Sequence, residues 1–293
     1  MRVLLLGKIG QLGWELQRTL APLGEVLALD FPEIDLTQAE GIYPVIQDSR
    51  PEVIVNATAY TAVDRAESEA EIAMAINGHA PKVLAEAAGS LGAALIHYST
   101  DYVYDGSKDS AYIETDRPNP LNVYGKSKLA GDQAIEASGS AYLILRTSWV
   151  YSRRRESFLT KVLQWSRQHR TLRVVTDQIA NPTWARMLAE ITSQLLAKTG
   201  GDPAGWISER RGVYHLAGDG YASRKEWAEV ILRYDPHPEE QVVEKLQAAQ
   251  TADFPTPAQR PLFSALNCDR FAETFGLRLP PWEKAVQLAM ESD

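Results

Sequence analysis

Short apolar segments alternate with longer segments of helical character through the first half of the chain. The apolar runs have the length of buried strands and span residues 3–6, 26–29, 53–55, 94–98 and 142–145. The helical patterns between them begin near Gly13, Thr37, Ala70 and Pro120. Strands that alternate with helices form right-handed βαβ units, whose parallel strands are covered by helices on both faces. We therefore predict an α/β fold built on a doubly wound parallel sheet.

From about residue 150 the alternation becomes less regular, because prolines break the chain into short pieces. These prolines include Pro182, Pro203, Pro236, Pro255, Pro257, Pro261 and Pro280. We expect residues 1–150 to form the main sheet domain. Residues 151–293 are expected to form mainly a smaller C-terminal substrate-binding region, with some segments returning to the sheet.

The composition limits the classes of partner. With 45% apolar and 23% charged residues, the 293-residue chain can bury a large core. Its formal net charge of −8 disfavours nucleic acid and anionic membranes as partners. The apolar start ends at Gly7, too early for a signal peptide or a membrane span. The one cysteine, Cys268, excludes an internal disulfide, so we expect a cytoplasmic location.

A glycine-rich turn follows the first predicted strand. Gly7, Gly10 and Gly13 allow a tight turn, and the helix that follows presents free N–H groups to a pyrophosphate. At the end of the second strand, Asp30 can accept hydrogen bonds from the ribose hydroxyls of an adenosine. Together these features predict a Rossmann-type dinucleotide-binding domain over residues 1–150, with NADH or NADPH as cofactor. Asp30 favours NADH, but Lys8 in the loop could offset its charge, so the preference between the two stays open.

Two further segments could contact the dinucleotide. Asp35 and Leu36 are placed to lie beside the adenine, although Asp35 is an equally good cap for the next helix. The third strand ends in Asn56-Ala57-Thr58-Ala59-Tyr60-Thr61, whose small residues would let a cofactor lie flat against the backbone or let the strand end pack under a helix. Neither segment decides between its two interpretations alone.

The spacing Tyr-x-x-x-Lys places both side chains on one face of a helix. It occurs three times, at Tyr104 to Lys108, Tyr124 to Lys128, and Tyr221 to Lys225. The first pair encloses a turn sequence, and the third lies late in the chain, where no sheet strand supplies partners. The second lies where a helix should begin after residues 118–120, between two predicted strands.

Tyr124, Lys128 and Thr100 match what the reduction of a ketone requires. Hydride delivery to the carbonyl carbon builds negative charge on oxygen, which an acid must neutralise. We predict that Tyr124 donates the proton, and that Lys128 lowers the pKa of this tyrosine and binds the nicotinamide ribose. Bringing a tyrosine pKa from about 10 to about 7 takes roughly 4 kcal/mol, which a lysine cation about 4 Å away supplies at an effective dielectric constant near ~20. Thr100 would orient the tyrosine and the substrate oxygen.

Longer motifs extend beyond these spacings. They are GKIGQLG at 7–13, AYTAVD at 59–64, STDYVYDG at 99–106, VYGKSKLAG at 123–131 and RTSW at 146–149, with Asp177-Gln178, Asn181-Pro182-Thr183 and Arg260-Pro261 later in the chain. Over nearly its whole length the chain thereby resembles the dTDP-4-dehydrorhamnose reductase family of extended short-chain dehydrogenases/reductases. The resemblance implies reduction of the C4 ketone of dTDP-4-dehydro-β-L-rhamnose to give dTDP-β-L-rhamnose. The expected partner is thus a dTDP-linked 6-deoxy-4-keto sugar.

The resemblance also implies roles for single residues. The matching cofactor positions are Gly10, Gln11, Leu12, Asp30, Asp35, Leu36, Ala59, Tyr60, Thr61 and Tyr98, in addition to Gly7, Gly13, Tyr124 and Lys128. The matching sugar-nucleotide positions are Thr100, Asp101 and Trp149. Trp149 would offer the deoxysugar a flat apolar wall, or would instead pack the seam between the domains.

Two places depart from the family pattern. Some relatives bind magnesium through glutamates between subunits. Glu15 matches the first of these, but Arg186 stands where the second is expected, so magnesium is doubtful and no metal ligands are assigned. That mode of dimerisation loses support with it, and a homodimer stays open. The run Arg153-Arg154-Arg155 could hold the diphosphate, although a solvated loop is the favoured interpretation.

Other functions fit less well. A 4,6-dehydratase of the superfamily would carry an Asp-Glu pair after the threonine, where Asp101-Tyr102 stands, and an epimerase-reductase like GDP-fucose synthase would use a mid-chain cysteine. A hydrolase would need a GxSxG elbow or metal-ligand spacing, which the sequence lacks. We expect His97 and His215, in apolar strands, to be core residues. A non-catalytic dinucleotide-binding regulatory subunit stays open, because that role can coexist with intact motifs.

Overall fold

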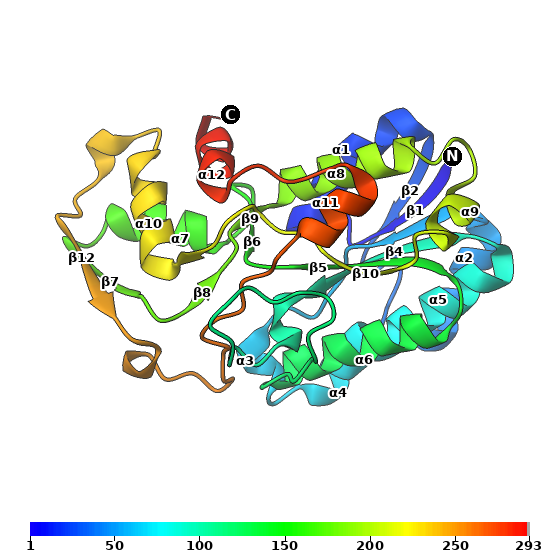
Figure 1. Ribbon diagram of the computed structural model, residues 1–293, viewed down its shortest axis with the longest axis horizontal. Coiled ribbons are helices and arrows are strands. Elements are labelled where there is room, and N and C mark those ends of the chain that lie inside the picture. The colour runs from blue at the N-terminus through cyan, green and yellow to red at the C-terminus, as the bar shows by residue number, and fades with distance from the viewer. Residues whose placement is uncertain (292–293) are drawn as a thin grey trace.

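A six-stranded parallel sheet forms the centre of the computed structural model, which describes residues 1–291 (Figure 1). The strand order is β10-β5-β4-β3-β1-β2, and all neighbouring strands are parallel. The strands are β1 (Arg2–Leu6), β2 (Glu25–Leu29), β3 (Val53–Asn56), β4 (Ala94–Thr100), β5 (Ala141–Thr147) and β10 (Gly212–His215). The predicted doubly wound parallel sheet is confirmed, and each of the five apolar runs is a strand.

The strand order reverses beside β1, because β2 pairs with one of its edges and β3 with the other. At such a switch point the connections leave in opposite directions and open a crevice at the carboxyl ends of the strands. The glycine-rich turn follows β1, and Asp30 follows β2. The topology therefore brings these two predicted cofactor elements to the same crevice.

Helices cover both faces of the sheet. α1 (Gln11–Leu20), α8 (Ala185–Ala197), α9 (Pro203–Ser208) and α11 (Asp269–Phe275) pack on one face, and α2 (Ala39–Ser49), α5 (Ala80–Leu91) and α6 (Val123–Ala137) pack on the other. Between β3 and α5 lie α3 (Val63–Ala66), α4 (Ala70–Met74) and a π-helical turn, η2 (Ala75–His79). The four predicted helix starts lie within three residues of the observed starts of α1, α2, α4 and α6. α6 starts at Val123 because the Asn122 side chain caps it by accepting a hydrogen bond from the Gly125 N–H.

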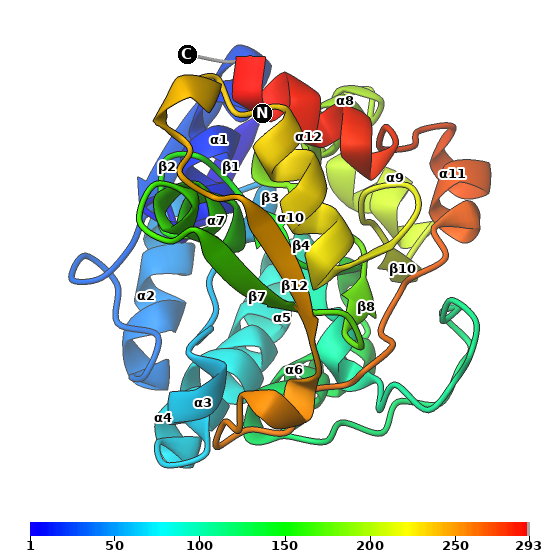
Figure 2. The same cartoon turned by 90° about the vertical axis from the view of Figure 1, so that its left-hand side faces the viewer.

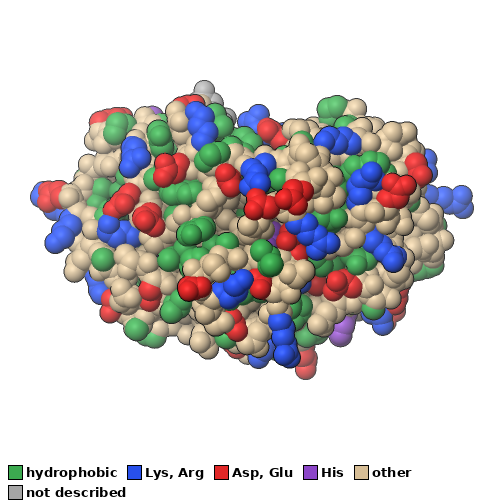
Figure 3. Space-filling view, viewed as in Figure 1, with side chains coloured by type: hydrophobic (Ala, Val, Ile, Leu, Met, Phe, Trp, Pro, Cys, Tyr) green, Lys and Arg blue, Asp and Glu red, His purple; other side chains and the backbone are tan. Residues whose placement is uncertain are grey.

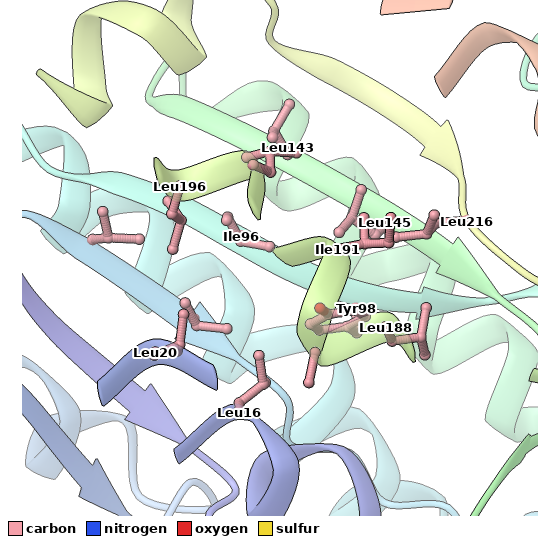
Figure 4. Close-up of a cluster of buried hydrophobic side chains, with 14 of the residues drawn as sticks. Leu16, Leu20, Ile96, Tyr98, Leu143, Leu145, Leu188, Ile191, Leu196 and Leu216 are labelled. Carbon is pink, nitrogen blue, oxygen red and sulfur yellow. The ribbon is translucent and has the colours of Figure 1, made fainter. Parts of the chain in front are cut away.

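The larger core lies between the sheet and helices α1 and α8 (Figure 4). The figure labels Leu16 and Leu20 from α1, Leu188, Ile191 and Leu196 from α8, Ile96 and Tyr98 from β4, Leu143 and Leu145 from β5, and Leu216. Ile96 and Tyr98 belong to this core, whereas Leu95 belongs to the core on the other face. Because both faces of β4 are buried, the strand is a continuous apolar run in the sequence rather than an alternating pattern.

The second half of the chain builds a smaller region, seen end-on in Figure 2, and also returns to the sheet. The smaller region contains α7 (Phe158–Ser166), β7 (Thr171–Val175), α10 (Arg224–Arg233), β12 (Lys245–Ala249) and α12 (Trp282–Glu291), which pack around Trp227. Short strands join the two parts: β6 (Val150–Tyr151) pairs with β9 (Thr183–Trp184), and β8 (Ile179–Ala180) pairs with β11 (Ala222–Ser223). The strand β10 and helices α8, α9 and α11 return to the sheet.

The surface carries charges of both signs. On the face drawn in Figure 3, acidic and basic side chains are interspersed rather than gathered into one patch of a single sign.

Within residues 1–291, none of the helices combines the length and the apolar character needed to cross a membrane.

A matched pair of glycine substitutions tests how closely α1 must approach the turn after β1. A Cβ on Gly13 would lie 1.9 Å from the Gly7 carbonyl oxygen, whereas a Cβ on Gly41 in α2 has no atom within 4 Å. Both changes to alanine gain helix propensity of about 1 kcal/mol. We expect Gly41→Ala to keep or raise the free energy of unfolding, measured in urea, and Gly13→Ala to lower it by about 1–3 kcal/mol or more. Equal effects of the two changes would contradict the close packing.

Candidate active site

A cavity of about 440 Å³ opens at the carboxyl ends of β1, β3, β4 and β5. Its lining includes residues that the sequence assigned to the site: Gly7, Gly10, Gln11, Leu12, Asp30, Ala59, Thr61, Tyr98, Tyr124 and Lys128. Ala57 and Thr58, from the small-residue segment at the end of β3, line it as well. Lining residues that the sequence did not single out are Ile9, Ser99, Thr147, Val150 and Glu156. Several of these lie inside the motif segments, and position within those motifs was the only available signal for them.

The glycine turn shapes one wall of the cavity. Gly7 has a φ of 92°, and a Cβ there would lie 2.9 Å from the backbone of Ala57. Gly10 precedes α1, and no side chain caps this helix, so its first N–H groups remain available to an anion. Gly13 does not line the cavity and acts by letting α1 pack against Gly7. The wall has the form that a pyrophosphate requires.

Asp30 lies at the cavity edge, and its carboxylate accepts hydrogen bonds from the backbone N–H groups of Ile9 at 3.0 Å and Phe31 at 2.9 Å. A carboxylate has further lone pairs with which to accept hydrogen bonds from a ribose. Lys8 forms an ion pair with Glu33, with its Nζ 2.7 Å from Oε1. The hydrogen bond from Lys8 holds the pKa of Glu33 below its ordinary value. Glu33 thus neutralises the charge of Lys8, so Lys8 does not offset the negative charge of Asp30.

A second cavity, of about 320 Å³, adjoins the first and shares Asp30, Thr58 and Ala59 with it. Asp35 and Leu36 line this cavity, where the sequence placed them beside an adenine. The Asp35 carboxylate also accepts hydrogen bonds from the backbone N–H and the hydroxyl of Thr37. It does not cap α2, whose capping position is Gln38, so the alternative interpretation of Asp35 as a helix cap is wrong.

Tyr124 and Lys128 lie one turn apart on α6, and both line the larger cavity. Thr100 ends β4 and forms a hydrogen bond with Tyr124. Burial raises the pKa of Tyr124 above its ordinary value, and the hydrogen bond with Thr100 offsets this only in part. Burial also lowers the pKa of Lys128 to about 8. The structure thus brings the three predicted catalytic side chains together.

The surroundings of Lys128 correct one expectation. Its Nζ donates a hydrogen bond to the Tyr98 carbonyl oxygen at 2.7 Å and lies 3.1 Å from Nε2 of His97. The expectation that the charge of Lys128 brings the pKa of Tyr124 down to about 7 is wrong for this structure, because burial outweighs the other influences on that pKa. His97 is buried, as expected of a core residue, but it also contacts the lysine. No motif or spacing signals this contact.

The other two Tyr-x-x-x-Lys pairs lie outside the cavity. Tyr104 is buried and hydrogen-bonds to His215, while Lys108 pairs with Asp116. Tyr221 is exposed, and Lys225 pairs with Glu229 along α10. Position relative to the sheet therefore separates Tyr124 and Lys128 from the two pairs of equal spacing.

The predicted sugar-nucleotide residues lie behind or beside the larger cavity. Asp101 is buried, and its carboxylate accepts hydrogen bonds from Thr100, Ser148 and Ser264. Trp149 has a φ of 40°, which is strained for a residue with a side chain. Its ring stacks on Trp227, and the guanidinium of Arg224 lies 3.6 Å from its centre. Tyr60, a predicted cofactor residue, hydrogen-bonds through its hydroxyl to Glu69.

The surface around Glu15 carries arginines rather than a cluster of acids. Burial raises the pKa of Glu15, and the charge of Arg186 is the largest of the influences that lower it. Arg186 also pairs with Glu190 at 3.0 Å. Among residues 1–291, one group of acidic and histidine side chains is close enough together to hold a metal ion: His237, Glu239 and Glu240. All three are exposed, and the group does not include Glu15.

The three consecutive arginines diverge. The Arg153 guanidinium donates to the Met290 carbonyl oxygen, Arg154 lies over the ring of Trp14, and Arg155 lines the larger cavity. All three are exposed, in a loop between β6 and α7. They do not form one anion site, because Arg153 and Arg154 line another cavity beside Glu15, whereas Arg155 lines the larger cavity.

Comparison with known proteins identifies the family. The family model described as RmlD substrate binding domain matches residues 1–293. The chain belongs to this family. A dTDP-4-dehydrorhamnose reductase of Burkholderia thailandensis is 41% identical to it over 99% of this chain and 98% of the relative. The resemblance inferred from the motifs is confirmed.

Solved structures of the family agree with this assignment. A dTDP-4-dehydrorhamnose reductase of Clostridium acetobutylicum superposes with a TM-score of 0.90 at 31% identity, covering 99% of both chains. The enzyme of the same name from Bacillus anthracis, solved in complex with NADP, gives a TM-score of 0.88 at 32% identity, covering 98% of this chain and 97% of the other. The likeness therefore extends over both the sheet and the smaller region.

The burial of Asp101 predicts a pH dependence of stability. Burial raises the pKa of this carboxyl to about 6, above the value of about 3.9 expected in the unfolded chain. The folded protein thus favours the protonated carboxyl, and this contribution to stability is lost as pH rises through about 6. We expect Asp101→Asn to gain stability relative to the unsubstituted protein, by up to about 3 kcal/mol, between pH 4.5 and pH 7. Urea unfolding at each pH measures the difference, and a difference independent of pH would contradict the assignment.

Proposed function

We propose that this protein is an NAD(P)H-dependent reductase that converts dTDP-4-dehydro-β-L-rhamnose to dTDP-β-L-rhamnose in dTDP-L-rhamnose biosynthesis. The observation that carries the proposal is one cavity that holds the glycine turn, Asp30, Tyr124 and Lys128 together. Membership of the RmlD family, and relatives named for this reaction, support it.

The residues present fit a nicotinamide dinucleotide. A Cβ at Gly7 would collide with the backbone, and the uncapped start of α1 offers N–H groups to the pyrophosphate. Asp30 would accept hydrogen bonds from the adenosine ribose, and Asp35 and Leu36, which line the adjoining cavity, would hold the adenine. Ala59, Thr61 and Tyr98 line the same cavity as Lys128, and Tyr60 lies between two of them in the chain. When bound, the reduced nicotinamide supplies the hydride.

The chain supplies the proton and the orientation. Tyr124 donates its hydroxyl proton to the C4 oxygen of the substrate as the hydride arrives at the carbon. Thr100, which forms a hydrogen bond with Tyr124, would orient the tyrosine and the C4 oxygen of the substrate. Lys128 binds the nicotinamide ribose, and its ammonium form stabilises the phenolate that Tyr124 becomes. Because the pKa of Lys128 is about 8, this form predominates at neutral pH.

The smaller region, mainly residues 151–293, forms the sugar-nucleotide side of the site in this proposal. Trp149 directly precedes that region, and its φ of 40° is strained for a residue with a side chain. Stacking on Trp227 and contact with Arg224 fix the ring plane, which suits a flat wall for the deoxysugar. The Thr100 hydroxyl donates a hydrogen bond of 3.2 Å to the Asp101 carboxylate, which helps to fix the position of Thr100.

A cytoplasmic location and a homodimer belong to the proposal as well. The free thiol of Cys268 suits a reducing compartment. The arginines that line one cavity with Glu15 disfavour a magnesium ion at that surface, since their positive charge repels a cation. A homodimer would have to form without such an ion.

Replacing the proton donor separates catalysis from binding. Tyr124→Phe removes the hydroxyl and keeps the ring, so we expect turnover of dTDP-4-dehydrorhamnose to fall by about 100-fold or more. The dissociation constant of the reduced cofactor should change little. Tyr221→Phe, from a pair of the same spacing outside the cavity, is the control and should keep full turnover. A Tyr124→Phe protein with normal turnover would overturn the assignment, and a natural protein that binds the cofactor without turnover would favour a regulatory subunit.

The acids around Lys8 predict the cofactor preference. Asp30 and Glu33 place negative charge where NADPH carries its 2′-phosphate, and Glu33 neutralises Lys8. We expect NADH to bind more tightly than NADPH in fluorescence titrations. Glu33→Gln should release Lys8 and lower the ratio of the NADPH to the NADH dissociation constant by about tenfold. Glu25→Gln, at the other end of β2, is the matched control, and equal effects of the two changes would contradict the account.

A further inference from the structure

A line of hydrogen bonds leads from the turn after β3 to the Nζ atom of Lys128. The Asn56 side chain at the end of β3 contacts Nδ1 of His97 on β4 at 3.0 Å. The other ring nitrogen, Nε2, lies 3.1 Å from Lys128 Nζ. All three side chains are almost fully buried, so each polar hydrogen in this line must find an acceptor within the protein.

The orientation of the Asn56 amide is fixed by a backbone group. The Thr58 N–H lies 3.1 Å from Asn56 Oδ1, and the Thr58 hydroxyl lies 2.5 Å from the same oxygen. A backbone N–H can only donate, so the atom facing it must be the amide oxygen. The amide nitrogen Nδ2 therefore faces His97 and donates to Nδ1.

This orientation determines the tautomer of His97. Because Nδ1 accepts from Asn56, it cannot carry a proton, and the proton of the neutral ring must be on Nε2. The ring is neutral because burial holds the pKa of His97 well below its ordinary value. The Nε2–H group then points at Lys128 Nζ, which can receive it only through the lone pair of a free amine.

The ammonium form of Lys128 would place an N–H against the Nε2–H of His97. Moving the imidazole proton to Nδ1 would relieve that conflict, but the Nδ1–H group and the Asn56 amide N–H would then face each other as two donors without an acceptor. Rotating the amide would in turn set Nδ2 against the Thr58 N–H. Each way of protonating Lys128 therefore costs one hydrogen bond in a buried site.

We propose that His97, held by Asn56 with its proton on Nε2, is a positioning residue that favours the free amine of Lys128 and sets the pH above which Tyr124 loses its cationic neighbour. The proposal rests on the proposed reductase function only where it concerns turnover. The tautomer itself is a property of the free protein.

The other charged or titratable groups around Lys128 either raise its pKa or keep one protonation state in the pH range where Lys128 titrates. Asp132, one turn further along α6, raises the pKa of Lys128, but its carboxylate also pairs with Arg146 of β5 at 3.1 Å. Tyr124 remains protonated because its pKa is raised. The charge of Asp101 raises the pKa of Tyr124, and the Tyr98 hydroxyl forms a hydrogen bond with Thr192 of α8. Burial lowers the pKa of Lys128, and the His97 contact is the specific hydrogen-bonding contact that acts in the same direction.

The tautomer can be read directly in the free protein. Long-range ¹H–¹⁵N correlation spectra distinguish a protonated from an unprotonated ring nitrogen, and the His97 signals are those that disappear in His97→Gln. At pH 9, above the pKa of Lys128, we expect His97 to carry its proton on Nε2 and none on Nδ1. A proton on Nδ1 would overturn the proposal, whatever reaction the protein catalyses.

The functional consequence is tested by the pH profile of kcat/KM. Loss of the ammonium lowers kcat/KM as pH rises through the pKa of Lys128, which is about 8. Asn56→Asp replaces the amide N–H by a carboxylate that accepts from Nδ1–H, so Nε2 becomes an acceptor for the ammonium. We expect the alkaline limb of the profile, where kcat/KM falls as pH rises, to shift to higher pH by about one unit or more in this variant.

Two substitutions of His97 distinguish the hydrogen bond from the added charge of Asn56→Asp. His97→Leu removes the opposing N–H without adding charge and should also move the limb upward. His97→Gln keeps an N–H toward Lys128 and an oxygen toward Asn56, so its limb should stay in place. Circular dichroism establishes folding of each variant. An unmoved limb in both folded Asn56→Asp and folded His97→Leu, or an equal shift in His97→Gln, would overturn the proposal.

Discussion

The burial of Lys128 beneath the carboxyl end of β4 is the constraint on which the site depends. A side chain that is 1% exposed must find partners within the protein, and here they are the Tyr98 carbonyl and His97, both from β4. These contacts fix α6 against the sheet. Tyr124, one turn earlier on the helix, is thereby carried to the Thr100 hydroxyl at the end of the same strand. Burial also brings the pKa of Lys128 down to about 8, so its charge becomes sensitive to neighbouring hydrogen bonds.

A second close contact positions the other half of the cavity. Because Gly13 has no Cβ, α1 can approach the Gly7 carbonyl, and the start of this uncapped helix faces the cavity. The reversal of strand order beside β1 brings this turn, Asp30 and the end of β4 to one crevice. The dinucleotide side and the proton-donating side are thus set by separate elements that share the carboxyl edge of the sheet.

The sequence predicted the sheet, its first five strands and the Tyr124–Lys128 pair, because each rests on local periodicity or on spacing along one element. It predicted that some segments of the second half return to the sheet, but it did not identify β10 as the strand that pairs with β5, since that pairing joins segments far apart in the sequence. Nor did it reveal the contact between His97 and Lys128. A histidine in an apolar strand has the same local pattern whether it packs a core, as His215 does, or meets a lysine. The pKa of Tyr124 was also wrongly anticipated, because burial cannot be read from the spacing of two residues.

The most direct test is whether the purified protein oxidises reduced nicotinamide when dTDP-4-dehydrorhamnose is added. The account predicts loss of absorbance of NADH or NADPH that depends on the sugar nucleotide, with dTDP-β-L-rhamnose as the product identified by NMR. Binding of both ligands without any oxidation would contradict it and would point instead to a regulatory subunit that keeps the dinucleotide fold.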